Sequence, residues 1–191
     1  MHKVKTIIFI DWDDTLFPTS YYKSNLIDNK KLSSLDDILS TFLQKYQKNN
    51  NIFIISNASA EWLKKSILLL PKTNDIVKML KIPIISARDT FIDKCELSRC
   101  KEKTFQEIVK KYDIFNNYNI ISIGDAHYEY VGLLKMNDYI NNLNKKCLLK
   151  NIKFMANPSN DEVYDQLEVL TEILKNIIIH PKFVDIQLHK N

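Results

Sequence analysis

The stretch IIFIDWDDTLFP, residues 7 to 18, contains an apolar run that ends abruptly in three aspartates within four positions. A continuous apolar run of this kind is typical of a strand that is buried on both faces of a parallel sheet. Carboxylates this close together repel one another, so they persist in open water or where a cation or a chemical step uses them. Asp11 and Asp13 can point into one crevice at a strand edge. We expect Trp12 to pack away from that crevice and Asp14 to cap a helix or face solvent.

The composition around this stretch indicates one globular domain spanning residues 1–191. The chain is 45% hydrophobic and 26% charged, which fits a chain with a proper core. It has only two glycines, Gly124 and Gly132, so a glycine-rich phosphate-binding loop is excluded. The net charge of +4 comes from scattered lysines, which mildly favours anionic substrates but makes no nucleic-acid footprint. A nucleic-acid substrate is not excluded.

The cysteines and the apolar runs exclude several other classes of protein. There are three cysteines and no C-x-x-C, so neither a disulfide framework nor a zinc site is indicated. The longest apolar runs are far shorter than the roughly 18 residues that span a bilayer. The apolar part of the first residues is also too short for a secretory signal. We therefore expect a cytoplasmic protein that makes no use of a membrane.

Short apolar runs alternate with helical patterns along the whole chain. The alternation predicts βαβ units and hence an α/β, doubly wound, Rossmann-like fold with a mainly parallel five-stranded sheet and helices on both faces. The expected strands are residues 6–10, 52–56, 82–86, 120–124 and 152–155. The expected helices cover residues 35–47, 60–70, 103–112, 129–143 and 159–180.

The last of these helices carries an apolar stripe. Its stripe consists of Leu167, Leu170, Leu174 and Ile177. We expect this stripe to pack on the sheet rather than to form a dimer surface. The protein should accordingly be a monomer or a weak dimer.

Polar and acidic residues follow the predicted strands, at the edge where doubly wound sheets bind ligands. Asp11 and Asp13 follow the first strand, Ser56 and Asn57 the second, Arg88 the third and Asp125 the fourth. Converging carboxylates without sulfur ligands suit Mg²⁺. A carboxylate can also attack phosphorus, a second acid can protonate the leaving oxygen, and hydroxyl and ammonium groups can hold the phosphoryl oxygens.

These residues resemble the motifs of the haloacid dehalogenase superfamily of phosphotransferases, in order from about residue 5 to about residue 155. The first motif, DxDx[TV] after an apolar strand, is matched by IIFIDWDDTL; the second by IFIISN; and the fourth, [GS]Dxxx[DE], by IISIGDAHYE. The third is a lysine at a helix start, for which we choose Lys101, with Lys103 as the alternative.

The resemblance implies a role for each matched residue. It implies Asp11 as nucleophile, Asp13 as general acid and base, and Ser56 and Lys101 as groups that hold the phosphoryl group. It places Mg²⁺ on the Asp11 carboxylate, the Asp13 carbonyl, Asp125 and Glu129. We assign Thr15, Asn57 and Arg88 to substrate binding, although Arg88 could instead pair with Asp89 on the surface. Glu129 could simply favour a helix N-terminus.

The spacing of the motifs leaves no room for a separate cap domain, so the resemblance is to capless members. An open site suits a large phosphorylated substrate, such as a phosphoprotein or a nucleic-acid end. Residues 17–33 should form a long loop, and Tyr21, Tyr22 and Lys23 could make it a small flap. The expected activity is a Mg²⁺-dependent phosphomonoester hydrolase working through an aspartyl-phosphate. The alternative is a catalytically silent phosphate-binding or scaffold module. A phospho-accepting receiver domain fits less well, because it places its acceptor aspartate at the end of the third strand, and IPIIS ends without an aspartate in that position.

Overall fold

The computed structural model describes residues 5–24, 29–112 and 116–188. In this part of the chain six strands form one open sheet, in the order β3-β2-β1-β4-β5-β6, and all neighbours are parallel. The α/β, Rossmann-like fold class is therefore confirmed, with one strand more than the five expected. The strands are β1 (Lys5–Ile10), β2 (Asn51–Ser56), β3 (Ile84–Ser86), β4 (Asn116–Gly124), β5 (Lys146–Lys153) and β6 (Val184–Gln187).

The sheet differs from the prediction at its C-terminal edge. The predicted strand 152–155 begins earlier, at Lys146, and β6 was not predicted at all. Lys150 interrupts the apolar pattern of β5, yet it is fully buried, because its Nζ donates to the carbonyl oxygens of Ile178 (2.9 Å) and His180 (2.8 Å). Strand β6 is a short edge strand of alternating half-buried and exposed residues, so no apolar run marks it.

The helices largely follow the apolar periodicity of the sequence. They are α1 (Thr19–Lys23), α2 (Asn29–Gln47), α3 (Ala60–Ile67), α4 (Pro71–Met79), α5 (Ala87–Phe91), α6 (Leu97–Lys111), α7 (His127–Asn142) and α8 (Asn160–Ile179). Ser59 caps α3, and Ser159 caps α8 in a capping box with Glu162. The predicted helix 60–70 ends early, at Ile67, and α4, which was not predicted, begins at Pro71. Pro71 disfavours a helical Leu70, whose φ is −123°.

The segment predicted as a long loop, residues 17–33, is largely helical. Its first part forms α1 and its last part opens α2, while residues 25–28 lie outside the described residues. No further folded unit lies between β1 and β2 in the described part of the chain, in agreement with a fold that has no separate cap domain. No described helix is long and apolar enough to cross a lipid bilayer.

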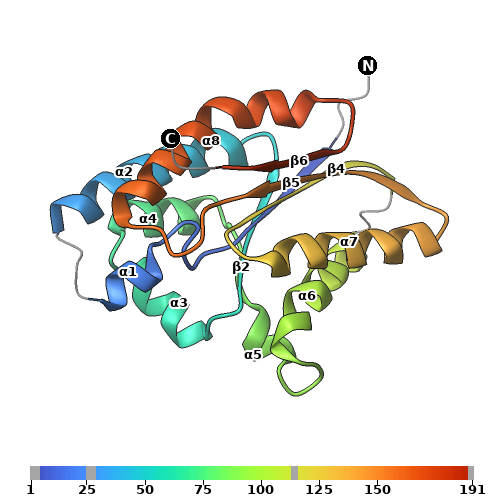
Figure 1. Ribbon diagram of the computed structural model, residues 1–191, viewed down its shortest axis with the longest axis horizontal. Helices are drawn as coiled ribbons and strands as arrows, with labels where there is room; N and C mark the ends of the chain where they lie inside the picture. The colour runs from blue at the N-terminus through green and yellow to red at the C-terminus, as the bar shows by residue number, and fades with distance from the viewer. Residues whose placement is uncertain (1–4, 25–28, 113–115, 189–191) are drawn as a thin grey trace.

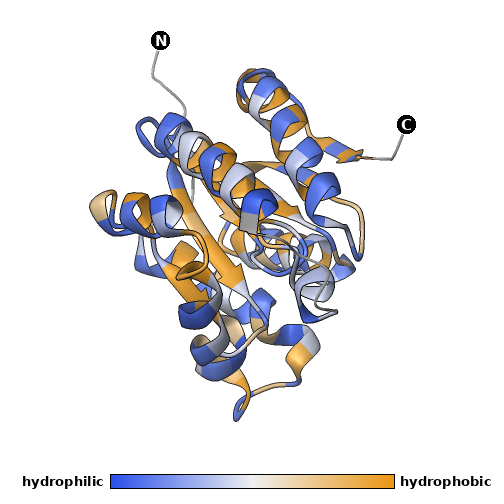
Figure 2. Ribbon diagram, turned by 90° about the vertical axis from the view of Figure 1, so that its left-hand side faces the viewer, coloured by the Kyte–Doolittle hydropathy of each residue, from blue (hydrophilic) through white to orange (hydrophobic). Residues whose placement is uncertain are grey.

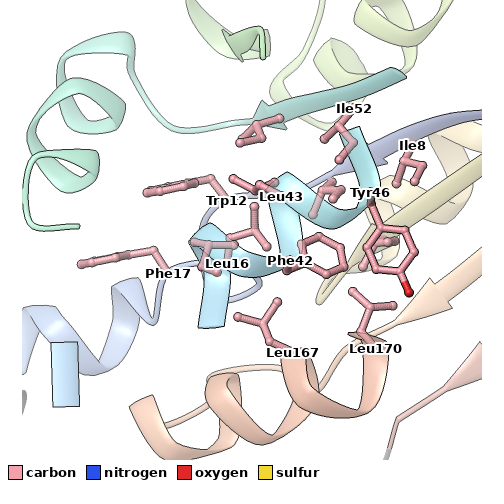
Figure 3. Packing of buried hydrophobic residues seen from close by; sticks show 14 of the residues in the cluster. Ile8, Trp12, Leu16, Phe17, Phe42, Leu43, Tyr46, Ile52, Leu167 and Leu170 are labelled. Carbon is pink, nitrogen blue, oxygen red and sulfur yellow. The ribbon is translucent and has the colours of Figure 1, made fainter. Parts of the chain in front are cut away.

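Helices cover both faces of the sheet (Figure 1). Alternate residues of β1 point to opposite faces, so Ile8 and Ile10 join one core and Ile7 and Phe9 the other. The first core contains residues of α2, α4 and α8, including the predicted stripe of Leu167, Leu170, Leu174 and Ile177 (Figure 3). The second core contains residues of α6 and α7. Figure 2 shows the result, with apolar strands inside and hydrophilic residues along the outer sides of the helices.

The strand order places a topological switch point beside β1. The chain runs from β1 through β2 to β3 on one side, and then crosses to β4 on the other side of β1. The carboxyl ends of β2, β1 and β4 are therefore neighbours, and the Asp11 N–H donates to the Ile123 carbonyl oxygen at 2.9 Å. Ligands of open α/β sheets bind in the crevice at such a point.

Candidate functional site

Asp11, directly after β1, forms a buried ion pair with Lys101 of α6. The Lys101 Nζ lies 2.7 Å from the Asp11 Oδ1 and also pairs with the Glu129 Oε1, and all three side chains are buried. Burial raises the pKa of Asp11 well above its usual value, Lys101 opposes this effect, and the negative charge of Glu129 adds to it. Burial alone would lower the pKa of Lys101, but the two carboxylates outweigh it and raise that pKa.

Glu129 holds this lysine from the first turn of α7. Its Oε2 accepts the N–H of Ala126 at 3.2 Å, so both oxygens of Glu129 are engaged by protein donors. A Cβ on Gly124 would lie 2.4 Å from the Glu129 Cγ. The end of β4 therefore needs a glycine for the carboxylate of Glu129 to lie over it. The expectation that Glu129 binds a metal stays a prediction.

Asp125, directly after β4, lies beside the same group of charges. Burial raises the pKa of Asp125 to about 6, with the charges of Glu129 and Asp14 adding to the effect and Lys101 opposing it. Thr15 is fully buried, and its Oγ1 lies 3.5 Å from the Asp125 Oδ1. Thr15 thus contacts a predicted metal ligand, and its predicted role in substrate binding stays a prediction. The Lys153 Nζ donates to the Asp125 carbonyl oxygen at 2.7 Å.

Asp13 has a different environment, made of neutral donors. Its Oδ2 accepts a hydrogen bond from the Ser56 Oγ at 2.5 Å, at the end of β2. Its Oδ1 accepts from the Thr19 Oγ1 at 2.6 Å and from the Trp62 Nε1 at 2.7 Å. The predicted convergence of Asp13 and Ser56 is therefore present, with α1 and α3 supplying the other two donors.

The other two residues of the DWDD run have structural contacts. Trp12 is fully buried, and its Nε1 donates to the Ser66 Oγ at 2.8 Å, as expected for a side chain that packs away from the crevice. Asp14 has a positive φ of 55° and accepts hydrogen bonds from the N–H and the hydroxyl of Ser20 in the first turn of α1. Asp14 thus accepts hydrogen bonds from the first turn of α1, which agrees with the first of the two expectations, helix capping or exposure to solvent.

The remaining predicted residues occupy different places at this edge. Both polar atoms of the Asn57 amide are buried without a hydrogen-bond partner in the described part of the chain. Arg88 lies on the surface of α5 with its Nε 4.0 Å from the Asp89 Oδ1. Lys103, the alternative to Lys101, is far more exposed, and its Nζ lies 3.9 Å from the Glu102 Oε1. Lys101 is thus the lysine that reaches Asp11.

Thr19 and Trp62 belong to this site, although neither was predicted from the sequence. Trp62 lies in the first turn of α3, three residues after the capping Ser59 and six after Ser56. A helix that starts directly after a strand brings its first turn back to that strand end, so the position of Trp62 is the signal that could have found it. Thr19 opens α1, a helix inside the segment that was expected to be a loop.

The donor set fits Mg²⁺ in its chemistry. Asp11 and Asp125 come from neighbouring strands, and the negative charge of Asp125 contributes to the raised pKa of Asp11. The Asp11 Oδ1 is buried and accepts no well-aligned hydrogen bond. Within the described residues, no group of three or more histidine, cysteine, aspartate or glutamate side chains is arranged to hold a metal. The fit thus rests on the oxygen chemistry of two carboxylates, Asp11 and Asp125.

No protein-family model matches this chain, and a search among curated proteins finds no match. The chemistry of the site must therefore be argued from its own residues.

Proposed function

We propose that this protein is a Mg²⁺-dependent phosphomonoester hydrolase of the haloacid dehalogenase type, with Asp11 as the nucleophile. The observation that carries the proposal is the pairing at the end of β1. Asp11 contacts a buried lysine, and Asp13, two residues later, contacts a serine at the end of the neighbouring strand. A carboxylate nucleophile, an ammonium and a hydroxyl for the phosphoryl oxygens, and a second carboxylate for proton transfer are the groups that this chemistry needs.

Lys101 has two roles in this proposal. Its ammonium lies against the Asp11 Oδ1, so it holds that side chain in place and opposes the rise in the pKa of Asp11 that burial causes. The same ammonium attracts the negatively charged oxygens of a phosphoryl group that approaches Asp11. Glu129 helps to hold Lys101 beside Asp11, because the same ammonium pairs with both carboxylates. We propose that Glu129 acts in this way rather than as a direct metal ligand.

Mg²⁺ would be held by the carboxylates of Asp11 and Asp125 and by the Asp13 carbonyl oxygen, and it would neutralise charge on the phosphoryl group. The surroundings of Asp125 favour a bound cation. Burial and the nearby carboxylates raise the pKa of Asp125, and a cation would offset the repulsion between these carboxylates. The Thr15 hydroxyl would help to orient the Asp125 carboxylate through its contact with Oδ1.

The phosphoryl oxygens would meet Ser56 and Asn57 at the end of β2. The two buried polar atoms of Asn57 have no hydrogen-bond partner among the described residues, and buried polar groups without partners are rare in folded proteins. A bound phosphoryl group or leaving group supplies such a partner. Arg88 lies further out on α5, where an anionic group of a larger substrate could reach it.

The substrate class follows from the absence of a cap between the described strands. Among the described residues, α1 and α3 lie beside Asp13, and their Tyr22 and Trp62 rings lie 6.0 Å apart. The ammonium of Lys23 lies 5.2 Å from the Trp62 ring, which gives this flank a positive charge. An open crevice of this kind suits a phosphate carried on a macromolecule, which itself excludes water.

Hydrolysis assays test the proposal directly. Wild-type protein should release phosphate from p-nitrophenyl phosphate and from a panel of phosphopeptides, nucleotides and 5′-phosphorylated oligonucleotides when Mg²⁺ is present, and EDTA should abolish the release. Asp11→Asn should remove the activity, whereas Asp37→Asn, at an exposed ion pair with Lys72, should retain it. Equal inactivity of wild type and Asp11→Asn across the panel would support the alternative, a silent phosphate-binding module.

A further inference from the structure

The two oxygens of the Asp13 carboxylate have different partners. Thr19 and Trp62 both donate to Oδ1, from helices α1 and α3, whereas Ser56 donates to Oδ2 from the end of β2. Three donors from three separate elements thus fix the orientation of one side chain. In the proposed function this side chain is the general acid and base, so its orientation decides which oxygen faces the substrate.

We infer that Trp62 and Thr19 are positioning residues that anchor Oδ1 of Asp13, and that Oδ2 is the oxygen that exchanges the proton with the leaving group. This inference rests on the proposed function. Ser56 supplies the reason for the difference between the two oxygens. Its hydroxyl has one proton, which it donates to Oδ2, while its Oγ accepts the N–H of Ala58 at 2.8 Å.

A bound substrate changes only one of these three hydrogen bonds. When the Ser56 hydroxyl turns its single proton toward a phosphoryl oxygen, it can no longer donate to Oδ2. Oδ2 then faces the leaving group without a protein donor, while Thr19 and Trp62 still hold Oδ1. The carboxyl group therefore keeps its position at the moment at which its free oxygen must act.

The proton balance of the reaction is simple. Asp13 enters the first half as a neutral carboxyl that carries its proton on Oδ2. An Asp11 oxygen forms a bond to phosphorus as the bond from phosphorus to the leaving oxygen breaks, and the leaving oxygen takes that proton, which leaves Asp13 ionised. In the second half water attacks phosphorus, the bond from phosphorus to Asp11 breaks, and Oδ2 takes a proton from the water. Asp13 ends as it began, with Oδ1 held throughout.

The packing around Trp62 suits a fixed donor. Its ring lies edge-on to Phe17 at 6.1 Å between centroids and tilted to Tyr22 at 6.0 Å, and its main-chain N–H is capped by Ser59. The other tryptophan, Trp12, donates instead to Ser66 in the core. The chain therefore contains a natural control, because only one of its two indole N–H groups points at Asp13.

Two variants, Trp62→Phe and Thr19→Val, test the inference, and Thr19→Ser is the matched control for the second. Trp62→Phe keeps a ring in place but removes its donor, and Thr19→Val removes a hydroxyl that Thr19→Ser retains. p-Nitrophenyl phosphate has a leaving group that needs little protonation, whereas phenyl phosphate has one that needs more. We expect Trp62→Phe and Thr19→Val to lower kcat/KM for phenyl phosphate about 10-fold or more but for p-nitrophenyl phosphate less than about 3-fold, since positioned acids contribute about 10²–10⁴-fold. Thr19→Ser should resemble wild type with both esters.

A second readout needs neither turnover nor metal. In ¹⁵N-tryptophan-labelled protein without Mg²⁺, Asp13→Asn should move the indole N–H resonance of Trp62, assigned with Trp62→Phe, and leave that of Trp12 in place. A uniform loss with both esters in Trp62→Phe, or an unmoved Trp62 resonance in Asp13→Asn, would overturn the inference. If wild type hydrolyses neither ester while the Trp62 resonance does move, the proposed function itself fails, and Trp62 is then only a structural donor.

Discussion

Asp11 and Asp13 are two residues apart at the end of one strand, yet charged side chains surround Asp11 and neutral hydrogen-bond donors surround Asp13. Asp11 belongs to a charged half of the site, formed by Asp11, Lys101, Asp125 and Glu129. Asp13 belongs to a neutral half, in which Thr19, Ser56 and Trp62 donate hydrogen bonds. Changes in the charged half should thus appear in both stability and chemistry, whereas changes in the neutral half should appear mainly in chemistry.

The largest expected effect is on turnover in the charged half. Asp11→Asn should lower hydrolysis by at least about 10³-fold, because the amide is a poor nucleophile and the reaction loses its covalent route. Steady-state assays with Mg²⁺ measure this loss. Activity within about 10-fold of wild type, with the variant confirmed by mass spectrometry, would remove Asp11 from the role of nucleophile.

The largest expected effect on stability comes from breaking the buried ion pairs. Lys101→Met should lower the free energy of unfolding by about 3–5 kcal/mol, because it leaves the carboxylates of Asp11 and Glu129 buried without a cation. Urea unfolding at pH 7 measures the change. Lys103→Met is the matched control, with an expected change within about 0.5 kcal/mol because Lys103 is much more exposed. If Lys101→Met and Lys103→Met lost similar amounts of unfolding free energy, the buried ion pairs of Lys101 would not stabilise the charged half as described.

The two glycines of the chain give a smaller and more local test. In Gly124→Ala the new Cβ would lie 2.4 Å from the Glu129 Cγ, so Glu129 must move, at a cost of about 1–3 kcal/mol. In Gly132→Ala the nearest atom belongs to Phe105 at 3.2 Å, and the gain in helix propensity, about 1 kcal/mol, offsets most of the strain. Thermal unfolding measures the stability of both variants. A larger loss of stability in Gly132→Ala than in Gly124→Ala would be the opposite of our expectation.

Asp125 should make the stability of the metal-free protein depend on pH. Its folded pKa of about 6 exceeds its ordinary value of 3.8, so between these pH values the folded state holds a proton that the unfolded state has lost. Stability should therefore fall as pH rises from about 4 to about 6, by about 1–2 kcal/mol once partial exposure is taken into account. Urea unfolding in the presence of EDTA measures this pH dependence. In Asp125→Asn, the loss of stability between about pH 4 and about pH 6 should be smaller by this amount. Parallel pH profiles of the two proteins would show that Asp125 is not perturbed.

The smallest expected effect on stability lies in the neutral half. Thr19→Val removes one neutral donor to Asp13 and should lower the free energy of unfolding by only about 0.5–1.5 kcal/mol. Urea unfolding at pH 7 gives the value. A loss as large as that of Lys101→Met would mean that the two halves of the site do not differ in the way described.

The charged half could be predicted from the sequence better than the neutral half. Asp11, Lys101 and Asp125 lie beside strand ends or at the start of a helix, and acidic residues at such places are conspicuous in an apolar run. Thr19 and Trp62 could not be chosen, because a threonine and a tryptophan usually serve packing or capping, and α1 was expected to be a loop. Strand β6 was missed for a related reason, since it lacks a continuous apolar run.

Trapping of a phosphorylated residue is the most direct test of the central claim, that Asp11 accepts the phosphoryl group. Wild-type protein would be mixed with p-nitrophenyl phosphate and Mg²⁺, quenched in acid and reduced with borohydride, which converts an aspartyl-phosphate to homoserine. Peptide mass spectrometry should then find homoserine at residue 11 only when substrate and Mg²⁺ are both present. Turnover by the wild-type protein with unmodified Asp11, or with the modification at Asp125 instead, would contradict the account.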